Sequence, residues 1–399
     1  MINFYKNVNE LLKNIQNYKL FIKLIYIFIL IIIIYISIIN IPETNNLLLK
    51  FDKDEREINY YSKYKNLTNK YSKDPFYHSF LKEISITSYD YSKLSNNNNT
   101  KVHIMINLNN KYIYPTIISI NSALKNSNKS TTTLVYHVLH TKDLKNEYIN
   151  MIKSFLYIYP KNLEFIFYNM GNNLVQLRNS RLTQVSFYRL ISPIFIPLDR
   201  IIYLDSDVLI LKDIKEMYLL NFHNNYVLGY LDYLTANKDS IGIKSEKYIN
   251  DGVMLMNLNK IREDNKHFEL LYMSTNIKNL INQDQTVINY ILYPNIGILP
   301  FKFGIFNFPS IFDMKYIYLN SIRQKLNFTE LLSAFIDPSL IHFVLCYPKV
   351  WNSNSKYNKE STRNGTLYKD KCEKFHKMWI DYAKDTIYYN DIKKIYKMS

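Results

Sequence analysis

Two aspartates, Asp205 and Asp207, lie two residues apart between apolar runs in the segment from Arg200 to Leu211. In an extended segment, side chains at i and i+2 point to the same face, so both carboxylates can converge on one divalent cation. Burying such a pair without a cation or hydrogen-bond donors costs roughly several kcal/mol. The spacing therefore predicts a site for a hard, oxygen-ligated metal; the simpler alternative is a strand end that faces water.

Three later residues stand where apolar stretches begin or end. Gly252 precedes a predicted strand in a chain with only seven glycines; it indicates either close approach of the backbone to a ligand or a turn with positive φ. Asp284 opens a helix-like stretch and is either a functional acid or a helix cap. His342 follows an apolar run, where a histidine is more often a hydrogen-bonded structural residue than a metal ligand.

The elements that must position these residues form an alternating pattern. Short apolar runs alternate with longer helical patterns, which predicts an α/β sheet. Ligands of open α/β sheets bind at the carboxyl ends of strands, and this is where the pattern places the two aspartates. The predicted strands are Val102–Ile106, Leu134–Leu139, Leu163–Phe167 and Ile201–Leu204, and helices are predicted at Tyr114–Leu124 and within Arg181–Ile194.

The N-terminal region predicts a membrane anchor. Residues 20–41 are apolar apart from a few positions, which is long enough for one span, and lysines dominate the preceding residues. We therefore expect a cytoplasmic tail at 1–19, a transmembrane signal anchor at 20–41, a polar stem at 42–100, and a single-pass type II protein of the Golgi or endoplasmic reticulum membrane with a lumenal head. A cleaved signal peptide is the competing interpretation.

Composition excludes some classes of function. The formal charge is +16, but the lysines are scattered and no nucleic-acid motif is present, so we expect no nucleic-acid partner. Cys346 and Cys372 lack the paired spacing of a zinc site. Near the C-terminus, Phe375, Met378, Trp379 and Tyr382 recur at helical spacing and predict a helix that packs on the core, with contact to a membrane or partner as the alternative.

Taken in order, the motifs resemble glycosyltransferase family 8, a family of retaining enzymes that use sugar nucleotides. The resemblance runs from about Val102 to Lys384. It implies a single Rossmann-like, nucleotide-sugar-binding domain of the GT-A type with a mixed central sheet at 101–384, followed by a tail at 385–399. The motifs that carry it are Asn107-Leu108-Asn109-Asn110-Lys111-Tyr112, Ser186-Phe187-Tyr188-Arg189-Leu190, Tyr203-Leu204-Asp205-Ser206-Asp207-Val208, Asn250-Asp251-Gly252-Val253, Gln283-Asp284-Gln285 and Ile341-His342-Phe343.

The resemblance also implies roles for individual residues. The metal would be Mn²⁺ or another divalent cation, and the donor a UDP-sugar whose hexose or pentose passes to a glycan, protein or lipid. Asp205, Asp207 and His342 would bind the metal; Asn109 and Tyr112 would meet the uracil; Arg189, Ser206, Gly252 and Lys349 would belong to the donor site; and Asn250, Asp284 and Gln285 would act at the sugar.

Some positions depart from the family's pattern. Asn109 stands where an acid is usual, and Asp251 stands where a small residue is commoner. The segment from His342 to Trp351 lacks an expected Gly after the histidine and has one extra residue. Two interpretations of Lys349 therefore stay open, a phosphate-binding residue and a solvated surface lysine. Two alternatives therefore remain: a catalytically inactive relative that serves as a glycan-binding or scaffolding subunit, and a phosphatase of the haloacid dehalogenase type. The later sugar-site motifs weigh against the phosphatase.

Overall fold

The computed structural model describes residues 66–67, 69–90, 99–174, 184–232, 247–276, 283–306, 327–344 and 365–396. Within these ranges, no helix combines the length and the apolar character needed to cross a bilayer. The predicted cytoplasmic tail at 1–19 and the predicted span at 20–41 lie outside the described residues.

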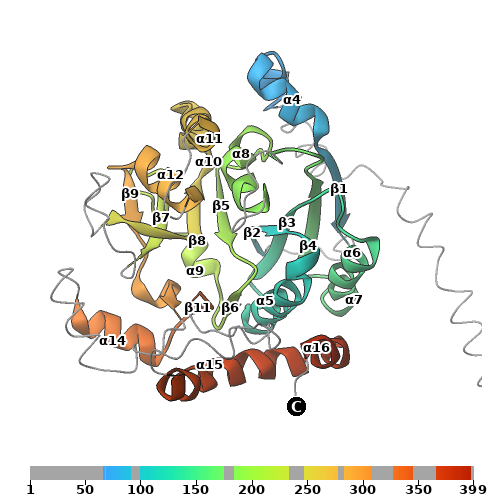
Figure 1. The fold of residues 1–399 in the computed structure, drawn as a ribbon, viewed down its shortest axis with the longest axis vertical. Coiled ribbons are helices and arrows are strands. Elements are labelled where there is room, and N and C mark those ends of the chain that lie inside the picture. The colour runs from blue at the N-terminus through green and yellow to red at the C-terminus, as the bar shows by residue number, and fades with distance from the viewer. Residues whose placement is uncertain are drawn as a thin grey trace, which may run out of the picture. The chain divides into compact units, whose positions relative to one another are not determined.

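A mixed sheet forms the centre of the domain (Figure 1). Among the described residues its strand order is β1-β4-β3-β2-β5-β8-β7-β9, with β2 to β5 mutually parallel and β1 and β8 antiparallel to their neighbours β4 and β5. The prediction of an α/β domain with a mixed central sheet is confirmed. The bounds are β1 (Ser85–Asp90), β2 (Thr100–Leu108), β3 (Thr132–His140), β4 (Leu163–Asn169), β5 (Arg200–Leu204), β7 (Val227–Leu231), β8 (Ile249–Asn257) and β9 (Ile296–Ile298).

A smaller sheet continues from the main one. Its order is β10 (Ile305–Phe306), β11 (Leu340–His342) and β6 (Val208–Ile210). β11 pairs antiparallel with β6, and His342 lies opposite Val208 in the register. Since β6 follows β5 after three residues, the chain passes from one sheet to the other at the predicted acid pair.

Helices cover the sheet because its strands are apolar on both faces. Every residue of β3 is buried, as expected of a central parallel strand. α5 (Ile113–Asn126) begins as predicted with Pro115 in its first turn, and it shares an apolar core with the side chains of Val102, Ile104 and Ile106. α12 (Gln283–Leu292) contacts β8 and α11 (Lys266–Asn276). Both the first turn of α12 and the carboxyl end of β5 carry predicted site residues.

The remaining helical segments are short or lie toward the chain ends. They are α4 (Pro75–Glu83), η2 (Asn110–Tyr112), α6 (Asn146–Lys153), α7 (Phe155–Ile158), η4 (Gln184–Phe187), α8 (Tyr188–Ile191), η5 (Ser192–Ile194), α9 (Lys215–Tyr218), α10 (Leu258–Glu263), η8 (Phe301–Phe303), α14 (Phe328–Ile336), α15 (Gly365–Lys384) and α16 (Tyr389–Tyr396).

The structure differs from several predicted boundaries. Within the predicted helical range Arg181–Ile194, the described residues 184–194 form a short α-helix, α8, between two 3₁₀ turns, η4 and η5, and Pro193 lies in the second of these turns. The predicted stem at 42–100 includes β1, which extends the main sheet beside β4. The predicted tail at 385–399 includes α16, whose Ile392 and Tyr396 are buried.

The aromatic stripe near the C-terminus packs on the core, as predicted. Phe375 and Trp379 of α15 are buried, and Phe375 meets Phe343 edge to face. α15 also contacts α5, below which it lies in Figure 1. The Cys372 side chain and Cys346 lie outside the described part of the chain.

One glycine makes room for a buried tyrosine beside the small sheet. A Cβ at Gly304 would lie 2.1 Å from both Cβ and Cγ of Tyr230 in β7. These atoms are close to the backbone, so they cannot move aside as a side-chain tip can. A Cβ at Gly297 would instead meet Cδ2 of Leu228 at 2.3 Å, which is the flexible end of a side chain.

We expect Gly304→Ala to lower the free energy of unfolding by about 2 kcal/mol or more, because overpacking at a rigid contact strains the core. Gly297→Ala should cost less, since Leu228 can change rotamer. Urea unfolding followed by circular dichroism measures both values. Equal losses for the two variants would contradict this account of Gly304.

Candidate functional site

The crossing from β5 to β6 brings the two predicted acids together. β5 ends directly before Asp205 and β6 begins directly after Asp207, and the residues between form a turn. The acids are close because the chain turns from one sheet into the other between them. They are not two side chains on the same face of one extended strand, as the sequence pattern predicted. The N–H of Asp205 donates to Gly252 O at 2.8 Å, and the N–H of Phe343 donates to Asp207 O at 2.9 Å.

His342 completes a cluster with the two acids. Its Nε2 lies 3.0 Å from Asp207 Oδ1 and 3.5 Å from Asp205 Oδ2. One candidate ligand atom from each of the three residues lies within 4.8 Å of the others. His342 comes from β11, far along the sequence, so the pairing of β11 with β6 is what delivers it. Two carboxylate oxygens and an imidazole nitrogen are a donor set that suits Mn²⁺ and related divalent ions, so these residues fit the implied metal.

Gly252 lies within β8, whereas the sequence pattern placed it directly before a strand. Its φ is not positive, so no turn requires a glycine here. A Cβ at this position would lie 2.1 Å from His342 Cε1 and 2.7 Å from Asp205 Oδ2. Of the two explanations open from the sequence, the turn with positive φ is therefore wrong. The close approach that the structure shows is to the side chains of Asp205 and His342.

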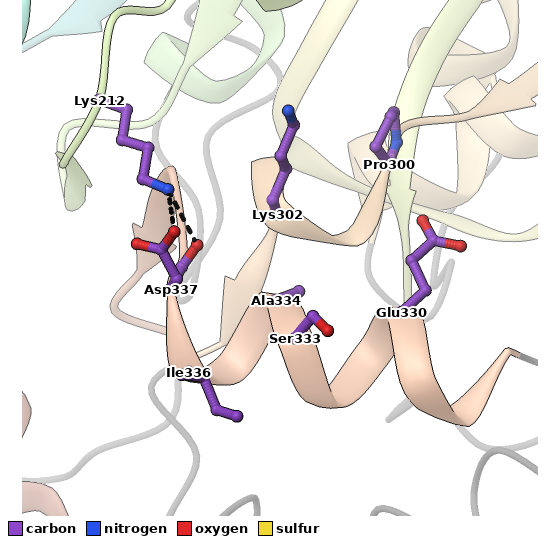
Figure 2. A pocket seen from close by; sticks show the side chains of 8 residues that line it. All are labelled: Lys212, Pro300, Lys302, Glu330, Ser333, Ala334, Ile336 and Asp337. Carbon is purple, nitrogen blue, oxygen red and sulfur yellow. Dashed lines mark hydrogen bonds and ion pairs between the residues drawn. The ribbon is translucent and has the colours of Figure 1, made fainter.

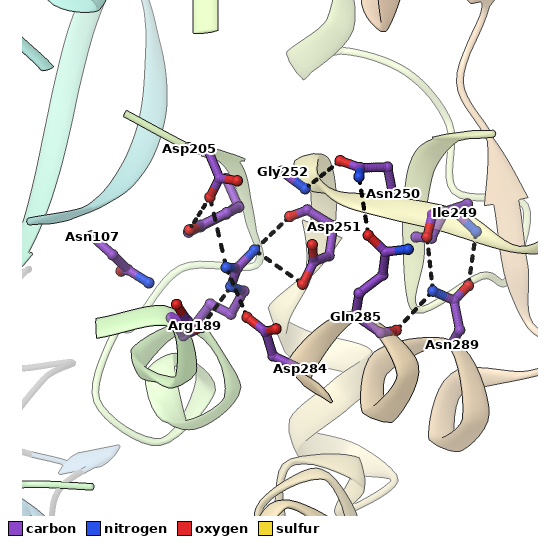
Figure 3. Close-up of polar contacts among 12 residues, drawn as sticks. Asn107, Arg189, Asp205, Ile249, Asn250, Asp251, Gly252, Asp284, Gln285 and Asn289 are labelled. Atoms are coloured by element: carbon purple, nitrogen blue, oxygen red, sulfur yellow. Dashed lines mark hydrogen bonds and ion pairs between the residues drawn. The ribbon is translucent and has the colours of Figure 1, made fainter. Parts of the chain in front are cut away.

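A buried guanidinium links the acid cluster to neighbouring carboxylates (Figure 3). Arg189, which is 3% exposed, lies 3.1 Å from Asp284 Oδ2, 3.4 Å from Asp251 Oδ2 and 3.6 Å from Asp205 Oδ1. It also donates to Asp251 O at 2.6 Å, and its guanidinium stacks 4.0 Å above the ring of Tyr203. Asp284 is therefore a partner of Arg189 at the start of α12.

Negative charge exceeds positive charge in this site. Burial would lower the pKa of Arg189, but Asp251, Tyr203, Asp205 and Asp284 together raise it. Burial raises the pKa of Asp284 to about 6 and that of Asp251 well above its ordinary value, although Arg189 opposes both shifts. One guanidinium does not balance these acids together with Asp205 and Asp207. A divalent cation at the cluster would reduce the excess.

A second group of buried polar side chains lies beside the cluster. Asn250 donates from Nδ2 to Gln285 Oε1 at 3.0 Å, and Gln285 donates from Nε2 to Asp232 Oδ2 at 2.7 Å. Tyr230 donates from its hydroxyl to Asn250 Oδ1 at 2.8 Å, and that hydroxyl also lies 2.6 Å from His342 Nδ1. Figure 3 shows Asn250 facing Gln285 across the gap between β8 and α12.

Sequence reasoning missed Tyr230 and Asp232. The run from Tyr226 to Leu231 is apolar apart from one glycine and is followed directly by an acid, as in the segment that ends at Asp205. The same rule that identified Asp205, an acid at the end of an apolar strand, could have found Asp232.

Other predicted donor-site residues lie at the end of β2 or outside the described residues. Ser206 donates to Asn107 O at 3.3 Å, which holds the turn against β2. Asn109 caps η2 by accepting from the N–H of Lys111, and Tyr112 at the end of η2 is half-buried. Lys349 lies outside the described residues.

A surface pocket of about 530 Å³ lies at the other end of the small sheet (Figure 2). Asp337 forms an ion pair with Lys212, next to the pairing of Leu340 with Ile210. The pocket is lined by charged, small and apolar side chains, and none of them is a predicted site residue. We therefore do not assign the chemistry to it.

Comparison with known proteins agrees with this geometry. The model of the Glycosyl transferase family 8 matches residues 103–355. The lipopolysaccharide 1,2-glucosyltransferase of Escherichia coli is 26% identical over 297 residues, which cover 69% of this chain and 86% of that protein. The glycosyltransferase GlyB of Streptococcus pneumoniae is 23% identical over 65% of this chain and 60% of its own length.

A solved structure shows the same fold. The galactosyltransferase LgtC, crystallised with donor and acceptor sugar analogues, superposes with a TM-score of 0.55 at 18% identity. The match covers 73% of this chain and all of that one.

The predicted location in a Golgi or endoplasmic reticulum membrane is wrong. The E. coli and S. pneumoniae relatives are bacterial proteins, and bacteria have neither compartment.

The family match covers well over half of the chain and includes the acid pair, the buried arginine, the segment Asn250-Asp251-Gly252 of β8 and His342. The fold and the relatives point the same way. The chain belongs to glycosyltransferase family 8 and is a glycosyltransferase.

Proposed function

We propose that the protein transfers a hexose or pentose from a UDP-sugar to a glycan, protein or lipid, with retention of configuration and with Mn²⁺ or a similar divalent cation. The observation that carries the proposal is the convergence of Asp205, Asp207 and His342 beside the buried amides of Asn250 and Gln285. A site for pyrophosphate next to a site for sugar hydroxyls is what a nucleotide-sugar donor requires.

Asp205, Asp207 and His342 would hold the cation, each through one ligand atom. A divalent cation in this place would offset the negative charge that develops on the departing nucleoside diphosphate. Gly252 leaves room for these side chains. The backbone hydrogen bonds of Asp205 and Asp207 hold the main chain from which the two carboxylates project. The ligands are therefore held in place before the donor binds.

Arg189 would place a positive charge next to the sugar. It is buried and bonded to Asp284 and Asp251, so its guanidinium stays where the fold puts it. Asp284 would orient sugar hydroxyls from the start of α12. Asp251 faces Arg189, and we propose that its role is to hold the guanidinium in place. The side chains that would contact the sugar are those of Asn250, Asp284 and Gln285.

Same-face attack by the acceptor fits the contacts of Gln285 and Asp284. A carboxamide is a weak nucleophile, and both ends of the Gln285 amide are engaged, with Asn250 and Asp232. Asp284 is bonded to Arg189, which lowers its nucleophilicity. We therefore expect retention without a stable glycosyl-enzyme intermediate, and trapping a glycosylated peptide at either residue would overturn this part of the proposal.

The uracil would lie at the end of β2. Tyr112 offers an aromatic face there for stacking on the base. Asn109 carries no charge and already caps η2, so its contribution to the base would be a hydrogen bond.

We expect Asp205→Asn to reduce cation-dependent transfer or hydrolysis of UDP-sugars roughly a hundredfold or more, because the amide is a poor ligand that brings no charge. The fold should survive, since Asn can still accept the hydrogen bond that Tyr203 donates to Asp205 Oδ1. The measurement is release of UDP from a panel of UDP-sugars with Mn²⁺, with chelator, and with Mn²⁺ restored.

Asp337→Asn is the matched control, since this exposed acid pairs with Lys212 at the other end of the small sheet. It should leave UDP release unchanged. A folded wild-type protein that binds UDP-sugars but turns over none of them would favour the inactive, glycan-binding alternative.

We expect the stability of the metal-free protein to depend on pH because Asp284 is buried. Its pKa is raised from 3.8 to about 6 in the folded state, so between these values the folded chain keeps a proton that the unfolded chain has lost. The contribution of Asp284 to stability therefore falls as pH rises through this window and does not return above it. Asn resembles the protonated acid and has no such loss.

Thermal unfolding in chelator should therefore show little difference between Asp284→Asn and the wild type at about pH 4, and a higher midpoint for the variant at about pH 7.5. Asp337→Asn, which changes an exposed acid outside the site, is measured alongside as the control. A difference between Asp284→Asn and the wild type that is the same at every pH would contradict the raised pKa.

A further inference from the structure

A chain of buried hydrogen bonds joins the predicted cation ligand His342 to the carboxylate of Asp232. Its members are Asp232, Gln285, Asn250, Tyr230 and His342, none more than 8% exposed. The successive distances, from Asp232 to His342, are 2.7, 3.0, 2.8 and 2.6 Å. The members come from β7, β8, β11 and α12, together with Asp232 directly after β7, so only the folded domain assembles the chain.

The direction of these bonds is fixed by one backbone N–H. The N–H of Gly252 can only donate, and it lies 2.9 Å from Asn250 Oδ1. The Asn250 amide must therefore turn its oxygen toward Gly252 and Tyr230 and its NH₂ toward Gln285. Gln285 then turns its oxygen toward Asn250 and its NH₂ toward Asp232, so the orientation of both amides follows from the Gly252 contact.

The same logic fixes the tautomer of His342. Because Asn250 presents its oxygen, the Tyr230 hydroxyl donates its hydrogen to Asn250. The Tyr230 oxygen can then only accept from His342, so Nδ1 carries a hydrogen. In a neutral imidazole this leaves the lone pair on Nε2, the nitrogen that faces Asp205 and Asp207.

We propose that Tyr230 is a positioning residue that holds His342 in the Nδ1–H tautomer, with Nε2 aimed at the cation, and that ties this ligand to the sugar-binding amides. The proposal rests on the proposed function, which places the cation at Asp205, Asp207 and His342. Hydrogen-bond partners of metal-binding histidines fix ring orientation and raise metal affinity, and their loss typically weakens binding about 10- to 100-fold. Gly304 leaves the space in which the Tyr230 ring lies.

Tyr230→Phe removes the hydroxyl and keeps the ring. We expect its Kd for Mn²⁺, measured by calorimetric titration of the protein without donor, to rise roughly tenfold or more. Turnover of UDP-sugar should fall at low Mn²⁺ and recover toward the wild-type value as Mn²⁺ is raised. A purely structural role would lower turnover at every Mn²⁺ concentration. Tyr136→Phe, which removes a buried hydroxyl without a hydrogen-bond partner, is the control and should leave Mn²⁺ affinity unchanged.

His342→Gln separates the test of the cation site from the test of Tyr230. If His342→Gln weakens Mn²⁺ binding and Tyr230→Phe does not, the cation site stands and the role of Tyr230 is refuted. If neither variant weakens binding, the cation site itself is refuted and with it the proposed function.

A measurement on the unaltered protein tests the tautomer directly. We expect ¹⁵N spectra of histidine-labelled protein with Zn²⁺, a diamagnetic ion that accepts imidazole ligands, to show His342 protonated at Nδ1. His342→Gln identifies the resonance by its loss. Protonation at Nε2 would overturn the proposal even if Tyr230→Phe failed to fold.

Discussion

The excess of carboxylates where the two sheets meet is the constraint on which the rest of the site depends. The chain leaves β5 and enters β6 within three residues, and the turn between them carries Asp205 and Asp207. Like charges this close repel, and burial increases the cost. Arg189 balances part of this charge, and burial raises the pKa of Asp284 although Arg189 opposes the shift. A site built in this way gains stability when a cation binds.

Tight packing keeps these groups in place. Gly252 and Gly304 lie where a single methyl group would collide with His342 or Tyr230. The histidine and the tyrosine hydroxyl therefore have little freedom to adopt another arrangement. Because Tyr230 bonds to both His342 and Asn250, and Asn250 bonds to Gln285, the groups proposed to hold the cation and those proposed to contact the sugar form one connected unit. Preorganisation of this kind avoids the cost of ordering the groups during the reaction.

Much of the fold could be predicted from the sequence because its elements are long and strongly patterned. The strands at Val102, Leu134, Leu163 and Ile201 and the helix at Tyr114 each lie where predicted, since runs of apolar residues with clear periods leave few alternatives. Predictions that rested on weaker patterns were less accurate. Polar composition concealed β1, which forms by pairing with β4, and the described part of Arg181–Ile194 forms a short α-helix between two 3₁₀ turns.

The sequence by itself determined which chemistry was possible: the acid pair, the later histidine and the glycine at 252 have few common explanations once they occur in one chain in this order. Only the tertiary structure decided how they meet. Asp205 and Asp207 converge because the chain changes sheets, His342 reaches them because β11 pairs with β6, and Gly252 is needed because of side chains nearly fifty residues before it and ninety after it. Tyr230 and Asp232 gained their place in the same way. Contacts between distant segments depend on strand pairing and packing, which local residue patterns do not encode.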